Sequence, residues 1–232
     1  MDLTLPQQIY LCTYAFTKNK FPATLLQFRG QRVRAAALTE LVLAGQAETD
    51  GRRVRVLGDQ SPTDPFLASV REELHARPKK WRALVHNTAH TAEKPVENQL
   101  TAAGIIEKKT GRTLSLLGGS KVVLRREEEA RAVRQALRTR VTTTPDPSTL
   151  PLAQVALPVI ALESDATMGV VLNRSERRKH KDTLGNSPRN SIEKYRACAK
   201  PCQTRCFPVG LSAADGAEQV RPKNEHVRRM RA

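Results

Sequence analysis

The fold is decided by the stretch RVRAAALTELVLAGQAETDGRRVRVL, residues 32–57. Its first half is rich in Ala and Leu, which are good helix formers, and Gly45 stands where a helix would be capped at its C-terminus. The dipeptide Asp50-Gly51 then separates two short alternating runs, which is a strong signal for a β-hairpin. The stretch therefore predicts a helix, a capping glycine and a hairpin as one unit.

The same unit recurs once along the chain. Residues 96–103 predict a helix that ends at Gly104, and the following IIEKKTGRTLSLL has Thr110-Gly111 in the turn position. Residues 121–124 are a further candidate strand. A single recurrence is not a repeat array, so the pattern predicts two small hairpins inserted into a helical domain.

Further helices are predicted around these units. Thr4 as N-cap and Pro6 in the first turn predict a helix near the N-terminus. In the helix predicted over 125–140, we expect an inner face of Ala132, Val133, Ala136 and Leu137. The other predicted helices are residues 64–75, 81–90 and 149–172, the last broken at Pro158. The predicted fold class is mainly α: a compact helical domain with small inserted β-hairpins.

The charge divides the chain into two parts. It has 39 Lys and Arg against 23 Asp and Glu, for a net charge of +16, and residues 174–232 alone hold 15 against 6. The last quarter shows no apolar periodicity, so we predict a domain over 1–181 and a basic, loose tail over 182–232. No apolar run reaches the ~18 residues of a membrane span, which favours a cytoplasmic protein.

Several segments occur in an order seen in a known family. They are DLTLPQQIYLCTY (2–14), FRGQRVRAAALTELVLAGQ (28–46), SPTDPFLASVREEL (61–74), PKKW (78–81), NQLTAAGIIE (98–107) and GVVLNRSERRKHK (169–181). Together they resemble the Golgi phosphoprotein 3 family, most of all its bacterial, actinomycete-type branch. The resemblance implies a mainly helical, peripheral membrane protein that binds phosphatidylinositol 4-phosphate and acts as an adaptor for client proteins, with no cofactor.

The resemblance also implies a lipid head-group site. Arg29, in the pair Arg29-Gly30, matches a family arginine that contacts the head group, and a guanidinium suits bidentate contact with phosphate. The family has an aromatic residue nine positions earlier, where this chain has Lys20 with Phe21 beside it. The aromatic residue is therefore missing or shifted.

The two remaining basic positions of the family site fall on His90 and Glu93, and Lys94 follows. A phosphate monoester carries roughly −1.5 to −2 charges near neutral pH, so Glu93 replaces an attraction with a repulsion. Pro95 is expected to interrupt the helix at this point. The predicted head-group-binding residues are Arg29, Lys20, His90 and Lys94. The predicted ligand is either a phosphatidylinositol 4-phosphate-type head group or an anionic lipid surface in general.

A winged-helix nucleic-acid-binding protein is the alternative function. A helix followed by a glycine and a two-stranded wing is how such domains are built, and the basic charge suits phosphate contacts. A recognition helix needs exposed side chains that reach base edges, whereas the residues after Arg34, 35–44, offer only Thr39 and Glu40. With aromatic residues at only 4%, stacking of single-stranded bases is also disfavoured.

The sequence contains no catalytic constellation, so we expect a protein that is not an enzyme. It lacks the H-E-x-x-H, G-x-S-x-G and P-loop patterns. His86 and His90 are four residues apart and would share one face of a helix, but no further ligand at metal-binding spacing accompanies them. No metal site is therefore predicted.

Overall fold

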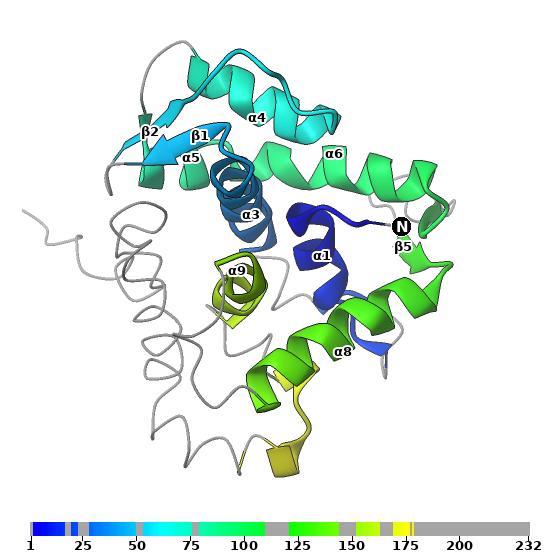
Figure 1. Cartoon of the computed structure of the whole chain (residues 1–232). Helices are drawn as coiled ribbons and strands as arrows, with labels where there is room; N and C mark the ends of the chain where they lie inside the picture. Colours follow the sequence, from blue (N-terminus) through cyan, green and yellow to red (C-terminus); the bar gives the residue numbers. More distant parts are fainter. Residues whose placement is uncertain are drawn as a thin grey trace, which may run out of the picture.

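The computed structural model describes residues 2–16, 20–22, 28–49, 53–75, 79–109, 121–143, 152–162, 169–176 and 178 (Figure 1). Its helices are α1 (Leu5–Cys12), α3 (Arg29–Leu43), α4 (Pro65–His75), α5 (Trp81–His86), α6 (Ala89–Ala102), α8 (Glu127–Thr143) and α9 (Leu152–Leu162). Its strands are β1 (Ala47–Thr49), β2 (Arg53–Val56), β3 (Lys79–Lys80), β4 (Ile106–Lys109) and β5 (Lys121–Leu124). The described part is thus mainly helical with two small antiparallel sheets, as the sequence predicted.

Helix α3 is the central element, in contact with α1, α4, α5, α6 and α9 (Figure 1). All of residues 32–39 are buried. The small side chains of Ala35, Ala36 and Ala37 let neighbouring helices approach closely. The closest approach is at Gly30, where an added Cβ would lie 2.2 Å from the carbonyl oxygen of Ala89. The glycine of the Arg29-Gly30 pair therefore permits the N-terminus of α3 to pack against α6.

Both predicted helix-glycine-hairpin units are present. Gly45 after α3 and Gly104 after α6 each have a φ of 68°, a left-handed conformation that favours glycine. β1 pairs antiparallel with β2, and β4 with β5. The predicted turns at Asp50-Gly51 and Thr110-Gly111 lie outside the described residues.

The sequence missed strand β3, which pairs with β2 in the register Arg53↔Lys80 and Val54↔Lys79. Two residues are too few to show an alternating pattern. β3 leads directly into α5 and so joins the first sheet to the helices around α3.

Two helix starts are stabilised by local polar side chains, of which only the Thr4 cap was predicted. The backbone N–H of Thr4 donates to Oε1 of Gln7 at 3.1 Å, as in a capping box. The carboxylate of Asp64 accepts from the N–H of Leu67 at 2.9 Å and opens α4. Local polar side chains therefore set where these two helices begin.

The structure corrects the predicted effects of two prolines. Pro95 lies inside a continuous α6 and Pro158 inside a continuous α9. Each removes a helical N–H and strains the preceding turn. Packing outweighs this cost: residues 155–161 of α9 are all buried, and α6 buries Val96 and Leu100 next to Pro95.

Two further predictions about helices were wrong in detail. The helix predicted over 81–90 is divided, because α5 ends at His86 and α6 begins at Ala89. On α8 the buried residues are Ala130, Val133, Leu137 and Val141, while Ala132 and Ala136 are exposed. Alanine carries little apolar surface, so its position alone did not identify the inner face.

The predicted boundary at 181/182 and the predicted tail lie outside the described residues. Among the residues that are described, no helix is long and apolar enough to cross a lipid bilayer.

Candidate functional site

Arg29 lies at the junction of α3 and α6, where the sequence placed the head-group site. Its Nε donates to Oε2 of Glu93 at 2.8 Å, and its guanidinium also forms an ion pair with that carboxylate. A second carboxylate oxygen, Oε1 of Glu97, lies 3.6 Å from Nη2 of Arg29. The Arg29 side chain is only 6% exposed. It is therefore a buried cation that is compensated by two glutamates of α6.

Two aromatic rings cover the guanidinium of Arg29. Its Cζ lies 4.3 Å from the ring centroid of Tyr10 and 4.8 Å from that of Phe21, within the range of cation–π attraction. The backbone of Lys20 pairs with that of Ala15 in an isolated bridge, and the Lys20 side chain is exposed. From this segment, therefore, the aromatic residue that contacts Arg29 is Phe21, next to the exposed Lys20.

Glu97 is tied to three groups. It accepts a hydrogen bond from the hydroxyl of Tyr10 at 2.8 Å and pairs with Nζ of Lys108 at 2.9 Å, in addition to facing Arg29. Burial raises the pKa of Tyr10 well above its ordinary value, so the phenol keeps its proton and remains a donor. We call Arg29, Tyr10, Phe21, Glu93 and Glu97 the Arg29 cluster.

The cluster leaves one donor unused. Nη1 of Arg29 is buried and has no hydrogen-bond partner among the residues that the structure describes. An unpaired buried donor is costly, and a guanidinium offers its N–H groups in one plane. The cluster can therefore accept one more anionic oxygen at Nη1 without breaking an existing bond.

The other predicted site residues lie around this cluster with exposed side chains: Lys20, His90 and Lys94. His90 and Lys94 are one turn apart on α6, on either side of Glu93 in the sequence. His86 belongs to α5, and its Nδ1 accepts from the side-chain amide Nε2 of Gln31 at 3.1 Å. The predicted shared helical face of His86 and His90 is therefore absent, because a helix boundary separates them.

The remaining arginines of α3 hold helices together rather than face solvent. Nε of Arg34 donates to the carbonyl of Leu84 at 3.0 Å, and its guanidinium pairs with Glu73. Burial lowers the pKa of Arg32. Because residues 32–39 are buried, α3 has no face to present to a DNA groove, which argues against the winged-helix alternative.

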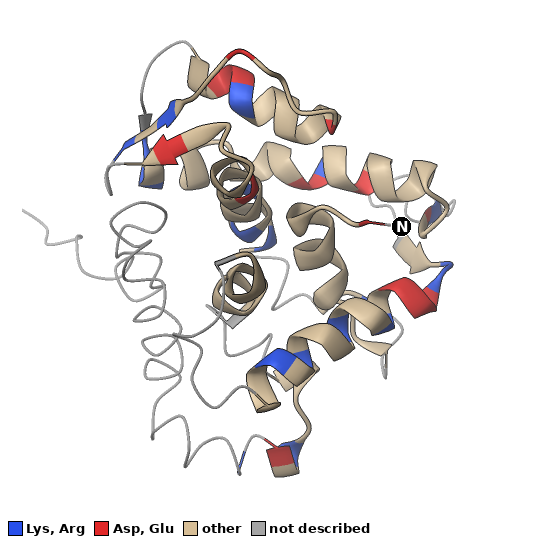
Figure 2. Cartoon of the chain, viewed as in Figure 1, with Lys and Arg blue, Asp and Glu red and all other residues tan. Residues whose placement is uncertain are grey.

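Basic residues are spread over several elements, including β2, α6 and α8, rather than gathered on one (Figure 2). Many of them are paired with acids. On the first sheet Arg55 pairs with Glu48, and beside the second sheet Arg125 pairs with Glu107. On α8, Arg131 pairs with Glu127. Each of these pairs is locally close to neutral, so these three arginines add little to the attraction of an acidic surface.

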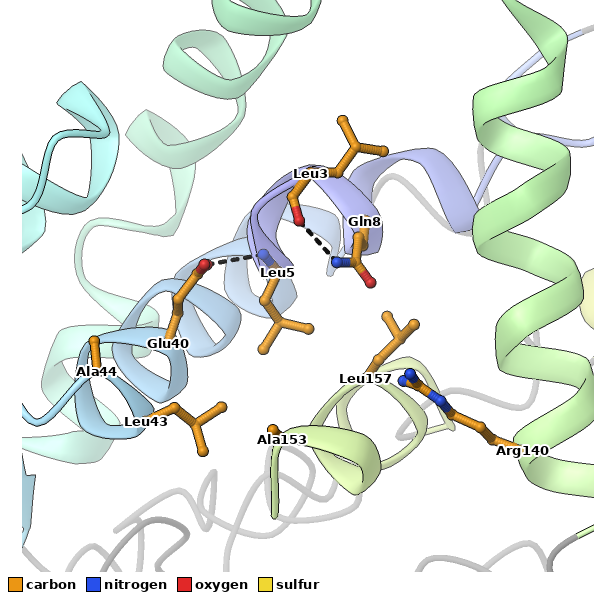
Figure 3. Close-up of a pocket in the computed structure, with 9 residues that line it drawn as sticks. All are labelled: Leu3, Leu5, Gln8, Glu40, Leu43, Ala44, Arg140, Ala153 and Leu157. Atoms are coloured by element: carbon orange, nitrogen blue, oxygen red, sulfur yellow. Dashed lines mark hydrogen bonds between the residues drawn. The ribbon is translucent and has the colours of Figure 1, made fainter. Parts of the chain in front are cut away.

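A cavity of about 370 Å³ lies between α1, α3, α8 and α9 (Figure 3). Apolar residues on its wall are Leu3, Leu5, Leu43, Ala44, Ala153 and Leu157, but polar atoms make up the larger part of its accessible surface. Its polar groups come from Gln8, Glu40 and Arg140. Glu40 accepts the N–H of Leu5 at 2.8 Å and so caps α1, and burial raises its pKa. Glu40 is eleven residues from Arg29 on α3, or roughly 16 Å along the axis, so this cavity is separate from the Arg29 cluster.

Comparison with known protein families finds one match over almost the whole chain. The family model described as Golgi phosphoprotein 3 (GPP34) matches residues 5–231. No match was found among curated proteins. The family match extends beyond residue 181 and so includes the positions that the sequence assigned to a tail.

Proposed function

The chain belongs to the Golgi phosphoprotein 3 family, and from this premise we propose that it is a peripheral membrane module that binds anionic lipid head groups. The predicted ligand class includes phosphatidylinositol 4-phosphate. The observation that supports the proposal is the Arg29 cluster, where a guanidinium with a spare N–H lies against two aromatic rings that also pack on each other. We further propose that the protein acts by binding lipid and client proteins rather than by catalysis.

Attraction between the basic chain and an acidic leaflet supports this function. Each basic residue near such a surface contributes about 1 kcal/mol. Lys20, His90 and Lys94 are exposed close in sequence to members of the Arg29 cluster. They are therefore the first contacts that we expect an acidic membrane to make.

Flotation of the full chain on vesicles tests this function. We expect the protein to float with vesicles of phosphatidylcholine mixed with an anionic lipid, and to remain unbound with phosphatidylcholine alone. Binding should fall steeply as salt rises from about 0.1 M to 1 M, because the Debye length shortens from ~10 Å to ~3 Å. Flotation that persists in 1 M salt would contradict an electrostatic mechanism, and equal binding to neutral vesicles would contradict anionic-lipid binding.

Duplex DNA provides a control for the alternative function. A charge-driven surface binds DNA weakly at low salt, whereas a nucleic-acid-binding protein retains sequence-selective binding near physiological salt. Selective binding of this kind would favour the nucleic-acid alternative over lipid binding.

A further inference from the structure

The cavity between α1, α3, α8 and α9 has an acidic and a basic side chain on its wall. Glu40 comes from α3, and Arg140 comes from the last turn of α8. Figure 3 shows their charged ends on opposite sides of the cavity, with the side chains of Leu5 and Leu157 between them. The volume of about 370 Å³ lies within the range of small-molecule sites, roughly 300–1,000 Å³. The wall therefore presents a carboxylate, an apolar middle and a guanidinium.

The helix cap that Glu40 makes does not require a charged side chain. Oε2 of Glu40 accepts the backbone N–H of Leu5 at 2.8 Å, and the amide oxygen of a glutamine would accept the same bond. Burial and the nearby carboxylate of Asp64 raise the pKa of Glu40, although the N–H of Leu5 acts in the opposite sense. Among the described residues, Glu40 has the N–H of Leu5 as a partner and no cation. A cation that enters the cavity would therefore stabilise this partly buried carboxylate.

Arg140 provides the opposite charge on the other side of the cavity. Its Nη1 donates to the backbone carbonyl of Gln154 on α9 at 3.3 Å, which holds the guanidinium at the cavity wall. A guanidinium has five N–H donors, so a carboxylate can bond it while the contact with Gln154 is kept. Bonds between a guanidinium and a carboxylate are among the stronger hydrogen bonds in proteins. Arg140 is therefore suited to bind the carboxylate of a ligand.

We infer that this cavity binds a short zwitterion with an ammonium group at one end of an aliphatic chain and a carboxylate at the other, as in an ω-amino acid. The ammonium group pairs with Glu40 and the carboxylate with Arg140, while the methylene groups lie against Leu5 and Leu157. A simple amine or fatty acid leaves one charge of the wall without its counter-charge, which is costly where that charge is partly buried. An α-amino acid carries both charges at one end and meets only one side of the cavity. The inference does not depend on lipid binding, because the cavity is separate from the Arg29 cluster.

Calorimetric titration of the full chain with ε-aminocaproate tests this site. Norleucine is the matched ligand, because it is an isomer of ε-aminocaproate with both charges at the same end. For so small a ligand we expect a dissociation constant in the millimolar range. ε-Aminocaproate should bind about tenfold more tightly than norleucine, the effect of one charge-assisted hydrogen bond. Equal affinities for the two isomers, or no heat of binding with either at tens of millimolar, would overturn the inference.

Two variants test the two ends of the site separately, with hexylamine and caproate as ligands that carry one charge each. Glu40→Gln keeps an acceptor for the N–H of Leu5 and removes the negative charge. It should weaken the binding of ε-aminocaproate and hexylamine about tenfold and should not weaken the binding of caproate. Arg140→Met should weaken the binding of ε-aminocaproate and caproate, and should not weaken the binding of hexylamine. If Arg140→Met does not fold, Glu40→Gln and the comparison with norleucine still decide whether the site exists.

Glu72→Gln is the charge-matched control variant. Glu72 is exposed on α4 and does not line the cavity, so this change alters the net charge by the same one unit at a distant position. ε-Aminocaproate, hexylamine and caproate should each bind this variant as they bind the native chain. If Glu40→Gln behaves like Glu72→Gln with all three ligands, the role assigned to Glu40 and its cavity is wrong. Vesicle flotation is a separate measurement, so failure of the cavity site and failure of lipid binding can be told apart.

Discussion

Replacing Gly30 by alanine tests the helix contact on which the candidate site depends. A Cβ at this position would lie 2.2 Å from the carbonyl oxygen of Ala89 and 2.9 Å from its carbon. Carbon–oxygen contacts in proteins are ordinarily about 3.3–3.6 Å, so α3 and α6 must separate by roughly 1 Å. The atoms in the way are backbone atoms, which cannot turn aside as a flexible side chain would.

The expected loss of stability follows from two opposing effects. Overpacking costs typically 1–3 kcal/mol, and a clash with backbone belongs at the upper end. Alanine regains about 1 kcal/mol over glycine inside a helix. The net destabilisation of about 2 kcal/mol corresponds to a fall of roughly 4–8 °C in the unfolding midpoint of a chain of this size.

Thermal unfolding of the full chain, followed by circular dichroism, measures this effect. Gly104→Ala is the control, because no atom lies within 4 Å of its added Cβ, yet its φ of 68° is unfavourable for alanine. Left-handed strain of about 1 kcal/mol should lower its midpoint by roughly 2–4 °C. A midpoint for Gly30→Ala at or above that of the native chain would show that helix propensity alone acts there and that α3 does not approach α6 closely.

Three further outcomes are expected. Burial raises the pKa of Cys12 to about 11, so peptide mapping after alkylation at pH 8 should find Cys12 labelled only in denaturant; rapid labelling of the native chain would contradict its burial. Burial also raises the pKa of Glu40, so the folded state binds its proton more tightly than the unfolded chain, whose carboxyl pKa is about 4.3. The wild type therefore loses stability relative to Glu40→Gln as pH rises from 4 to 7. Denaturant titrations at both pH values should show that the free energy of unfolding of the variant gains on that of the wild type. An equal difference at the two pH values would refute the raised pKa of Glu40. Deleting residues 182–232 should change the unfolding midpoint by no more than a few degrees, since that sequence has no apolar periodicity, and a larger fall would mean that these residues pack on the domain.

Local signals in the sequence were sufficient to predict most of the helices. Thr4 and Asp64 bond to backbone or side chains three residues away, and Gly45 and Gly104 end their helices through their own backbone conformation. Such features depend on neighbours in the chain, so a single sequence contains them. The continuity of α6 through Pro95 depends instead on burial against other helices, and propensity alone predicted a break.

Of the Arg29 cluster, the sequence predicted Arg29 as a site residue and singled out Phe21 and Glu93 as departures from the family pattern, whereas it missed Tyr10 and Glu97. The family pattern located Arg29 and identified Glu93 as a carboxylate in a basic position. That the two side chains bond each other across 64 residues follows from the packing of α3 on α6 at Gly30. The contact of Phe21 with Arg29 likewise depends on how the backbone folds beside the bridge between Lys20 and Ala15. The sequence alone does not show which of two adjacent residues, Lys20 or Phe21, faces Arg29.

The net charge of +16 overstates the basic charge that is accessible to a membrane. Near the candidate site the arginines are buried and the lysines are exposed. Arg29, Arg32 and Arg34 are buried within α3, where the planar guanidinium joins several elements at once. Lys20 and Lys94 are exposed beside the same elements. Substituting the arginines should therefore lower the free energy of unfolding. Substituting the lysines should lower membrane affinity and leave the unfolding midpoint nearly unchanged. A loss of membrane affinity on Arg29 substitution counts as evidence for a head-group site only where the unfolding midpoint is preserved.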